Sequence, residues 1–280
     1  MDISIFTTYT NPDLRNDPWK EALSCYGDFA DEIIVTGENW PDEFSWELIG
    51  ETFHEGFEKS SGDWAIRMDI DYFFHEKYIG YLRNTLEKYK DYPGVVFPQY
   101  QFFTPERFQL KARLCIALNK KCFPDIKLNA GGDLCLASLN GKILSVDKLP
   151  NVRIPVYQYD SMFRTKKIIA DDRARFARAW ERRFGEFGNR GGGGENDAYE
   201  AWFEEIKNKY KKHTNRLSID HHPKYIKNKL SNLSISQFGY DGFGLKHTTN
   251  RSLKNFIRGK KELYVDDILL NTFLKKNVFE

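Results

Sequence analysis

Two aspartates, Asp69 and Asp71, close the segment DWAIRMDID (63–71), and their type and spacing suit the binding of a divalent cation. Apolar and polar residues alternate through this segment, which predicts a β-strand. Alternate strand residues point to one side, so both aspartates should share a face with Arg67, with their Cα atoms roughly 6 to 7 Å apart. Carboxylates so close repel each other, and Mg²⁺ or Mn²⁺ held by one or two of them, phosphate oxygens and water would remove that repulsion. The pair therefore predicts a site for a metal-bound diphosphate. The alternative is a solvated acidic turn after a strand.

Predicted strands and helices alternate before and after this pair. Buried or β-branched runs at 3–9, 32–37, 64–71 and 95–100 predict strands, and helical spacing of apolar residues predicts helices between them. Such alternation favours an α/β fold with a mostly parallel sheet flanked by helices, whose ligands collect outside the carboxyl ends of the strands. The later part of the chain predicts long helices. We therefore expect a core over residues 1–160 and a mainly helical extension over 161–280 that packs on it.

Composition limits the possible classes of protein. The chain has 280 residues, of which 41% are hydrophobic and 29% charged, as in ordinary globular proteins. The formal charge of +2 gives no reason to expect a nucleic-acid partner. No apolar run approaches the ~18 residues of a membrane span, and the N-terminus has no signal-like pattern. The four cysteines form no CxxC pair, so we expect a reduced, cytoplasmic protein.

The order of these units resembles a known family. The segments ISIFTTYTNP, DEIIVTG and SSGDWAIRMDIDYFFHE, with a helix before the last, look like those of a GT-A type glycosyltransferase, similar to glycosyltransferase family 2. The resemblance covers about residues 1–100 and weakens toward residue 225. It implies a Rossmann-like nucleotide-sugar-binding sheet with a DXD motif. It also implies a metal-dependent, hexosyltransferase-like enzyme that inverts the anomeric carbon.

The resemblance also implies the ligands and their residues. The donor would be a nucleotide-sugar, and the acceptor a glycan, a lipid-linked molecule or another compound with a free hydroxyl. Asp71 would bind Mn²⁺ or Mg²⁺, and Asp69 would contact the ribose or donor sugar and share the metal. Arg67 would pair with a carboxylate or with the diphosphate. The residues expected to bind the donor are Thr7, Thr8, Tyr9, Glu38, Arg67 and Asp69.

An inverting transfer needs a carboxylate that takes the proton of the acceptor hydroxyl. The first choice is Asp133, because Gly131 and Gly132 before it permit close backbone approach. Asp160 and Glu106 are the alternatives. In RIPVYQYD, Gln158 stands where relatives often have histidine, which leaves a metal or proton role at that position in doubt.

Two further questions stay open at this level. Five arginines surround an aromatic stripe after Asp171, which is typical of a solvated helix face but would also suit an anionic acceptor. A nucleotidyltransferase with a paired-aspartate metal site, or a non-catalytic α/β module that binds a nucleotide or a partner, are the alternatives to a glycosyltransferase. A nucleotidyltransferase is disfavoured, because no glycine-rich segment with Lys or Arg, which would bind a triphosphate, follows the first strand.

Overall fold

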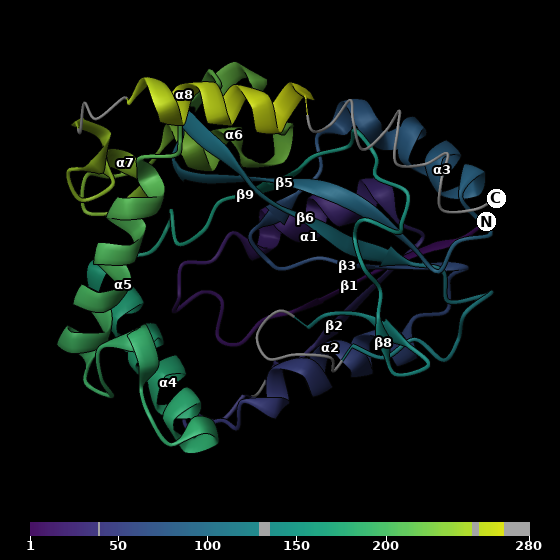
Figure 1. The fold of residues 1–280 in the computed structure, drawn as a ribbon, viewed down its shortest axis with the longest axis horizontal. Coiled ribbons are helices and arrows are strands. Elements are labelled where there is room, and N and C mark those ends of the chain that lie inside the picture. Colours follow the sequence, from purple (N-terminus) through teal and green to yellow (C-terminus); the bar gives the residue numbers. More distant parts are fainter. Residues whose placement is uncertain (39, 129–134, 248–251, 266–280) are drawn as a thin grey trace.

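The computed structural model describes residues 1–38, 40–128, 135–247 and 252–265. It is an α/β protein built around a mixed, mostly parallel sheet with helices on both faces, which confirms the predicted fold class (Figure 1). Within the described ranges, no helix has the length and apolar character needed to cross a membrane.

The main sheet has the order β2-β1-β3-β6-β5-β9-β4, with β10 pairing with β6 off this path. Strands β2, β1, β3, β5 and β9 run in one direction, while β6 and β4 run in the other. A separate two-stranded sheet is formed by β7 and β8. The strands are β1 (Ile3–Thr8), β2 (Glu32–Thr36), β3 (Trp64–Arg67), β4 (Tyr72–Phe73), β5 (Gly94–Thr104), β6 (Arg107–Leu118), β7 (Ser138–Leu139), β8 (Lys142–Ile143), β9 (Val156–Gln158) and β10 (Asn215–Arg216).

Helices cover the two faces of the sheet and continue beside it. The α-helices are α1 (Trp19–Phe29), α2 (Glu47–Lys59), α3 (Ile79–Lys88), α4 (Lys166–Phe184), α5 (Glu195–Tyr210), α6 (Lys224–Ser231), α7 (Phe238–Asp241) and α8 (Leu253–Lys260). The shorter turns are the 3-10 helices η1 (Glu76–Tyr78), η3 (Gly188–Arg190), η4 (Ile219–His221) and η5 (Leu245–His247), and the π-helix η6 (Lys261–Val265).

Side-chain alternation along β1 explains why helices pack on both faces. Ile3 and Ile5 point into a core formed with α1, α3 and α6, whereas Phe6 points into a second core formed with α2 and part of α4. Helix α2 approaches β1 so closely that a Cβ at Gly56 would lie 2.9 Å from a ring carbon of Phe6. Burial of these apolar faces holds β1 inside the sheet, between β2 and β3.

Helices α4 and α5 pack on each other and stand beside the carboxyl ends of the strands (Figure 1). Helix α4 begins at Lys166, because the Thr165 hydroxyl caps it by accepting a hydrogen bond from the Ile168 N–H at 3.4 Å. The glycine-rich segment 188–194 that follows α4 forms only the short turn η3 before α5 starts at Glu195. The part after residue 160 is mainly helical, yet β10 within it joins the main sheet, and the domain boundary itself stays a prediction.

Candidate active site

The two aspartates lie in a turn rather than on a strand. β3 ends at Arg67, and the Tyr72 N–H donates to the Asp69 carbonyl at 2.8 Å, closing the turn that leads into β4. The Tyr26 hydroxyl donates to the same carbonyl at 2.8 Å. The expected continuous strand is therefore wrong, because the chain must turn here to reach β4 and its partner β9. The Arg67 side chain still approaches Asp69, with Nη2 3.8 Å from Oδ2.

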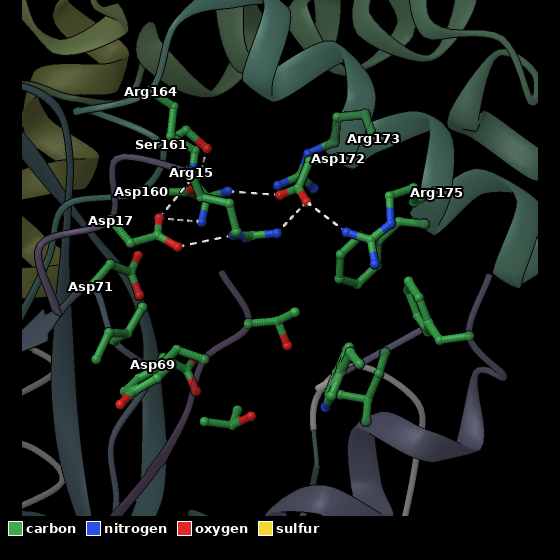
Figure 2. A pocket seen from close by; sticks show the side chains of 18 of the residues that line it. Arg15, Asp17, Asp69, Asp71, Asp160, Ser161, Arg164, Asp172, Arg173 and Arg175 are labelled. Carbon is green, nitrogen blue, oxygen red and sulfur yellow. Dashed lines mark hydrogen bonds and ion pairs between the residues drawn. The ribbon is translucent and has the colours of Figure 1, made fainter. Parts of the chain in front are cut away.

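The turn opens into a cavity of about 250 Å³ between the strand ends and helix α4, called the first cavity below. Figure 2 shows acidic and basic side chains from both walls facing this space. The sheet side of the lining comprises Thr8, Tyr9, Thr10, Asp69, Ile70, Asp71, Asp160 and Ser161. The opposite side comprises Trp40, Phe44, Ile49, Phe53, Asp172, Arg173, Arg175 and Phe176, with Arg15, Asp17 and Arg164 between the two. The cavity lies where an α/β sheet usually binds ligands.

Three carboxylates, those of Asp69, Asp71 and Asp160, meet on the sheet side. Burial, together with the charges of Asp160 and Asp69, raises the pKa of Asp71 to about 7. The Oδ1 atom of Asp69 is buried and has no hydrogen-bond partner in the described part of the chain. An unpaired acceptor beside mutually repelling carboxylates is the environment that a divalent cation would stabilise. No group of three or more His, Cys, Asp or Glu residues in the described ranges is arranged to hold a metal. A cation at this turn would be held by one or two carboxylates, with phosphate oxygens and water as its other ligands.

Buried glutamines from β5 and β9 position these carboxylates. Gln158 donates from Nε2 to Asp71 Oδ2 at 3.3 Å, and its Oε1 accepts from Gln99 at 2.8 Å and from Lys111 at 3.2 Å. Gln101 donates to Asp160 Oδ2 at 3.0 Å. A direct metal or proton role for Gln158 stays in doubt. Its side chain instead contacts the Asp71 carboxylate and supports it. Sequence reasoning missed this network, because its members come from β5, β6 and β9.

A buried ion-pair cluster fixes α4 against the loop that follows β1 (Figure 2). Arg164 binds Asp17 at 2.6 Å and Asp172 at 2.8 Å, and Arg15 bridges the same two carboxylates. Burial would raise the pKa of Asp172, but the guanidinium groups of Arg15, Arg164 and Arg173 outweigh it and lower that pKa to about 2. This cluster was not predicted, since nothing in the spacing of its members links them.

Of the residues expected to bind the donor, Thr8, Tyr9 and Asp69 line the first cavity. Burial and the nearby Glu38 carboxylate raise the pKa of Tyr9, although Glu38 itself is exposed beyond the cavity lining. Thr7 is fully buried and is absent from the described lining of the first cavity. The Arg67 guanidinium is buried over the Phe53 ring, with 5.0 Å to the ring centroid, next to the cavity. The donor roles of all these residues stay predictions.

The three candidates for the base are separated by their positions. Asp133 lies outside the described residues, so its role stays a prediction. Glu106 binds Lys246 at 2.9 Å and is absent from the described lining of the first cavity. Asp160 lines that cavity and accepts hydrogen bonds from Gln101 and from the Ser161 hydroxyl, at 3.0 and 3.1 Å. Burial would raise the pKa of Asp160, but the charges of Lys111, Arg173 and Arg164 lower it. Of the two candidates that the structure describes, Asp160 lines the first cavity and Glu106 does not, and the role of each stays a prediction.

Comparisons with known proteins give structural matches at low sequence identity. No family model matches it, and no curated protein matches it. Among solved structures, it is similar to S. aureus TarS 1-349, with a TM-score of 0.38 and 8% identity over 95% of this chain and 92% of that chain. The same TarS segment in complex with UDP gives a TM-score of 0.37 and 9% identity over the same shares. A longer S. aureus TarS structure gives 0.37 and 10% identity, covering 91% of this chain and 54% of that one. At these TM-scores the likeness supports no statement about the site, which rests on its own geometry.

Proposed function

We propose that this protein is a glycosyltransferase that moves a sugar from a nucleotide-diphosphate sugar to an acceptor hydroxyl. The supporting observation is that the Asp69–Asp71 turn, the end of β1 and Asp160 all line one cavity at the carboxyl ends of parallel strands. Paired carboxylates and flanking guanidinium groups suit a diphosphate with its counter-ion better than they suit a neutral ligand.

The donor would lie along the sheet side of the first cavity. Thr8 and Tyr9 would contact the base or ribose, and Asp69 the ribose or sugar. Asp71, with Asp69, would hold Mn²⁺ or Mg²⁺, which supplies charge stabilisation for the leaving diphosphate when it is bound. Gln158 keeps the Asp71 carboxylate oriented toward that position, because it donates to Oδ2. Holding donor and acceptor in line would supply much of the rate.

Asp160 would act as the base. Its carboxylate takes the proton of the acceptor hydroxyl while the hydroxyl oxygen forms a bond to the anomeric carbon. The bond between that carbon and the phosphate oxygen breaks, and the nucleoside diphosphate leaves with the electron pair. Attack from the face opposite the leaving group would invert the anomeric centre. Asp133 is retained as the competing candidate.

The function can be tested with UDP-, GDP-, CDP- and dTDP-linked sugars, with Mn²⁺, in the presence and absence of hydroxyl acceptors. We expect release of one nucleoside diphosphate, with NMR of the product showing the inverted anomer. Release of pyrophosphate from a nucleoside triphosphate would instead indicate a nucleotidyltransferase. Binding of a nucleotide with no turnover of any sugar nucleotide would favour a non-catalytic module.

A further inference from the structure

Helix α8 and the turn η6 that continues it lie at the periphery of the molecule (Figure 1). The side that faces the protein carries Asn255, Gly259 and Leu263, at intervals of four residues. Asn255 donates from Nδ2 to the Lys211 carbonyl at 3.2 Å, and a Cβ at Gly259 would overlap the Thr214 hydroxyl. Leu263 packs against the core of the sheet. These contacts fix which side of α8 faces away from the protein.

The outward side of α8 and η6 exposes large apolar side chains in one stripe, called the apolar stripe below. Leu253 is 73% exposed, Phe256 45%, Ile257 58% and Tyr264 61%. Their spacing of three, four and seven residues places them on one side of the helix. No other helix in the described part of the chain exposes more than one large apolar side chain. A patch of this kind on an otherwise polar surface marks a site of interaction.

Basic side chains border the apolar stripe and extend into it. Lys254 and Lys261 are exposed, and neither forms an ion pair within the ranges that the structure describes. Lys260 lies inside the stripe, with its Nζ 5.6 and 5.8 Å from the centroids of the two aromatic rings there. Arg258, by contrast, pairs with Glu262 at 2.7 Å. Three lysine charges therefore accompany the apolar stripe.

Apolar side chains bordered by lysines match the chemistry of an anionic membrane surface. The apolar groups can enter the boundary between headgroups and acyl chains, while the lysine stems lie along it and keep their ammonium groups among the lipid phosphates. A second copy of the chain fits less well, because a two-fold contact through this side would bring the lysines of both copies together. A nucleic acid would bind the lysines but leave Leu253 and Ile257 in water.

We propose that α8 and η6 form a membrane-contact surface that holds the protein on bilayers containing anionic lipids. The apolar stripe would lie in the headgroup region, parallel to the bilayer plane. Each lysine close to such a surface strengthens binding by about five-fold at moderate salt. This contact is independent of the chemistry at the first cavity, so its test is also independent of the proposed function.

Co-sedimentation of the full chain with vesicles measures the contact. Vesicles of phosphatidylglycerol mixed with phosphatidylcholine are compared with vesicles of phosphatidylcholine alone. We expect a partition coefficient at least about ten-fold higher on the anionic vesicles, and a difference that shrinks as the salt concentration rises. Equal binding to both kinds of vesicle, or binding to neither, would overturn the proposal.

Variants on the outward side separate the apolar contribution from the charge. Phe256→Ser with Ile257→Ser should lower the partition coefficient on anionic vesicles by about ten-fold or more, because the apolar groups no longer leave water. Lys254→Gln with Lys261→Gln should also lower it by about ten-fold or more, but should change binding to phosphatidylcholine little. All four side chains are exposed, so the Tm of both variants should stay close to that of the wild type.

The matched control lies on β8, away from α8 (Figure 1). Ile143 and Lys142 are both exposed there, and Ile143→Ser with Lys142→Gln should bind vesicles like the wild type. An equal loss in this control, or a loss from the lysine pair alone, would contradict a contact that uses the apolar stripe. Sedimentation velocity without vesicles should give the same oligomeric state for the wild type and for Phe256→Ser with Ile257→Ser. A dimer that this variant dissociates would assign the stripe to self-association and overturn the proposal.

Discussion

The Gln158 amide donates a hydrogen bond from Nε2 to Asp71 Oδ2 at 3.3 Å, across 87 residues of sequence. This contact joins the end of β9 to the turn after β3. It is reinforced by the main chain, where the Tyr159 N–H donates to the Asp71 carbonyl at 3.1 Å. The residue that follows, Asp160, is thereby brought to the same cavity as Asp71. The same segment thus orients the donor-side carboxylate and presents the candidate base.

The first prediction concerns the base. Asp160→Asn should lower kcat by about 10²- to 10⁴-fold while leaving donor affinity within a few-fold, because only proton transfer is removed. Steady-state kinetics with the sugar nucleotide that the donor screen identifies would measure this. Glu106→Gln, which removes a partner of Lys246 away from the cavity, is the matched control. If Asp133→Asn produces the large loss and Asp160→Asn does not, the base is Asp133.

The second prediction concerns the repulsion at Asp71. Burial and the charges of Asp160 and Asp69 raise the pKa of Asp71 to about 7, so its carboxyl is uncharged at pH 5 and ionised at pH 8. A raised carboxyl pKa means that the folded state binds more protons than the unfolded state between those pH values, so this group destabilises the fold as the pH rises. Asp71→Asn should therefore raise Tm at pH 8 by clearly more than it does at pH 5. Thermal unfolding at both pH values checks this, and an equal change at both would contradict it.

The third prediction concerns the ion-pair cluster that fixes α4. Asp172→Ala would leave Arg15 and Arg164 with an incomplete set of partners in a buried setting. We expect the free energy of unfolding to fall by about 3–5 kcal/mol, as when one partner of a buried pair is removed. Urea denaturation would measure it. The neighbouring Asp171 is exposed, and Asp171→Ala should change stability by no more than about 0.5 kcal/mol.

The fourth prediction concerns two buried histidines. Burial lowers the pKa of His213 to about 3 and that of His222 to about 4. His222 Nε2 donates to the Pro105 carbonyl at 2.9 Å, so its Nδ1 accepts from the Tyr159 hydroxyl at 2.7 Å in the neutral form. The unfolded chain binds more protons at these sites below about pH 6.5, so stability should fall as the pH decreases from there toward 4.

Urea denaturation from pH 7.5 to pH 4.5 tests the histidine prediction. His213→Phe should flatten the pH dependence of the free energy of unfolding, because a phenyl ring binds no proton. The ring can keep the stacking on Phe103, whose centroid lies 4.5 Å from that of His213, so the fold should be retained. His221→Asn, at the exposed neighbour of His222, should keep the wild-type slope. A slope that His213→Phe leaves unchanged would assign the acid sensitivity to other groups.

The sequence was sufficient for the features that depend on local pattern. The apolar and β-branched run at 3–9 and the helical spacing of apolar residues before Ser60 predicted β1 and α2, and the chain order placed Asp69 and Asp71 at the carboxyl end of a strand. The antiparallel pairing of β6 with β3 and β5 was not predicted, because strand order depends on tertiary contacts. The turn at Asp69 was also missed, since a short apolar–polar alternation is common to strands and to strand ends.

The site depends more on long-range contacts. Thr8, Tyr9, Asp69 and Asp71 were found from position and resemblance, but the glutamines that orient the carboxylates gave no signal. The arginines on α4 could be told apart only by their contacts, because Arg178 and Arg182 share Glu43 while Arg173 lines the first cavity. Helical spacing alone does not distinguish an arginine in an ion pair from one that lines a cavity.

The central claim is that the Asp69–Asp71 turn holds a metal-bound nucleoside diphosphate. The most direct test is calorimetric titration of the protein with UDP, GDP, CDP and dTDP, each with Mn²⁺ and with EDTA. We predict that at least one binds about ten-fold or more tightly with Mn²⁺, and that Asp71→Asn removes this difference. Asp63→Asn, at the opposite end of β3 where Asp63 pairs with Lys121 at 2.8 Å, should retain it. Metal-independent binding by the wild type, or full metal dependence in Asp71→Asn, would contradict the claim.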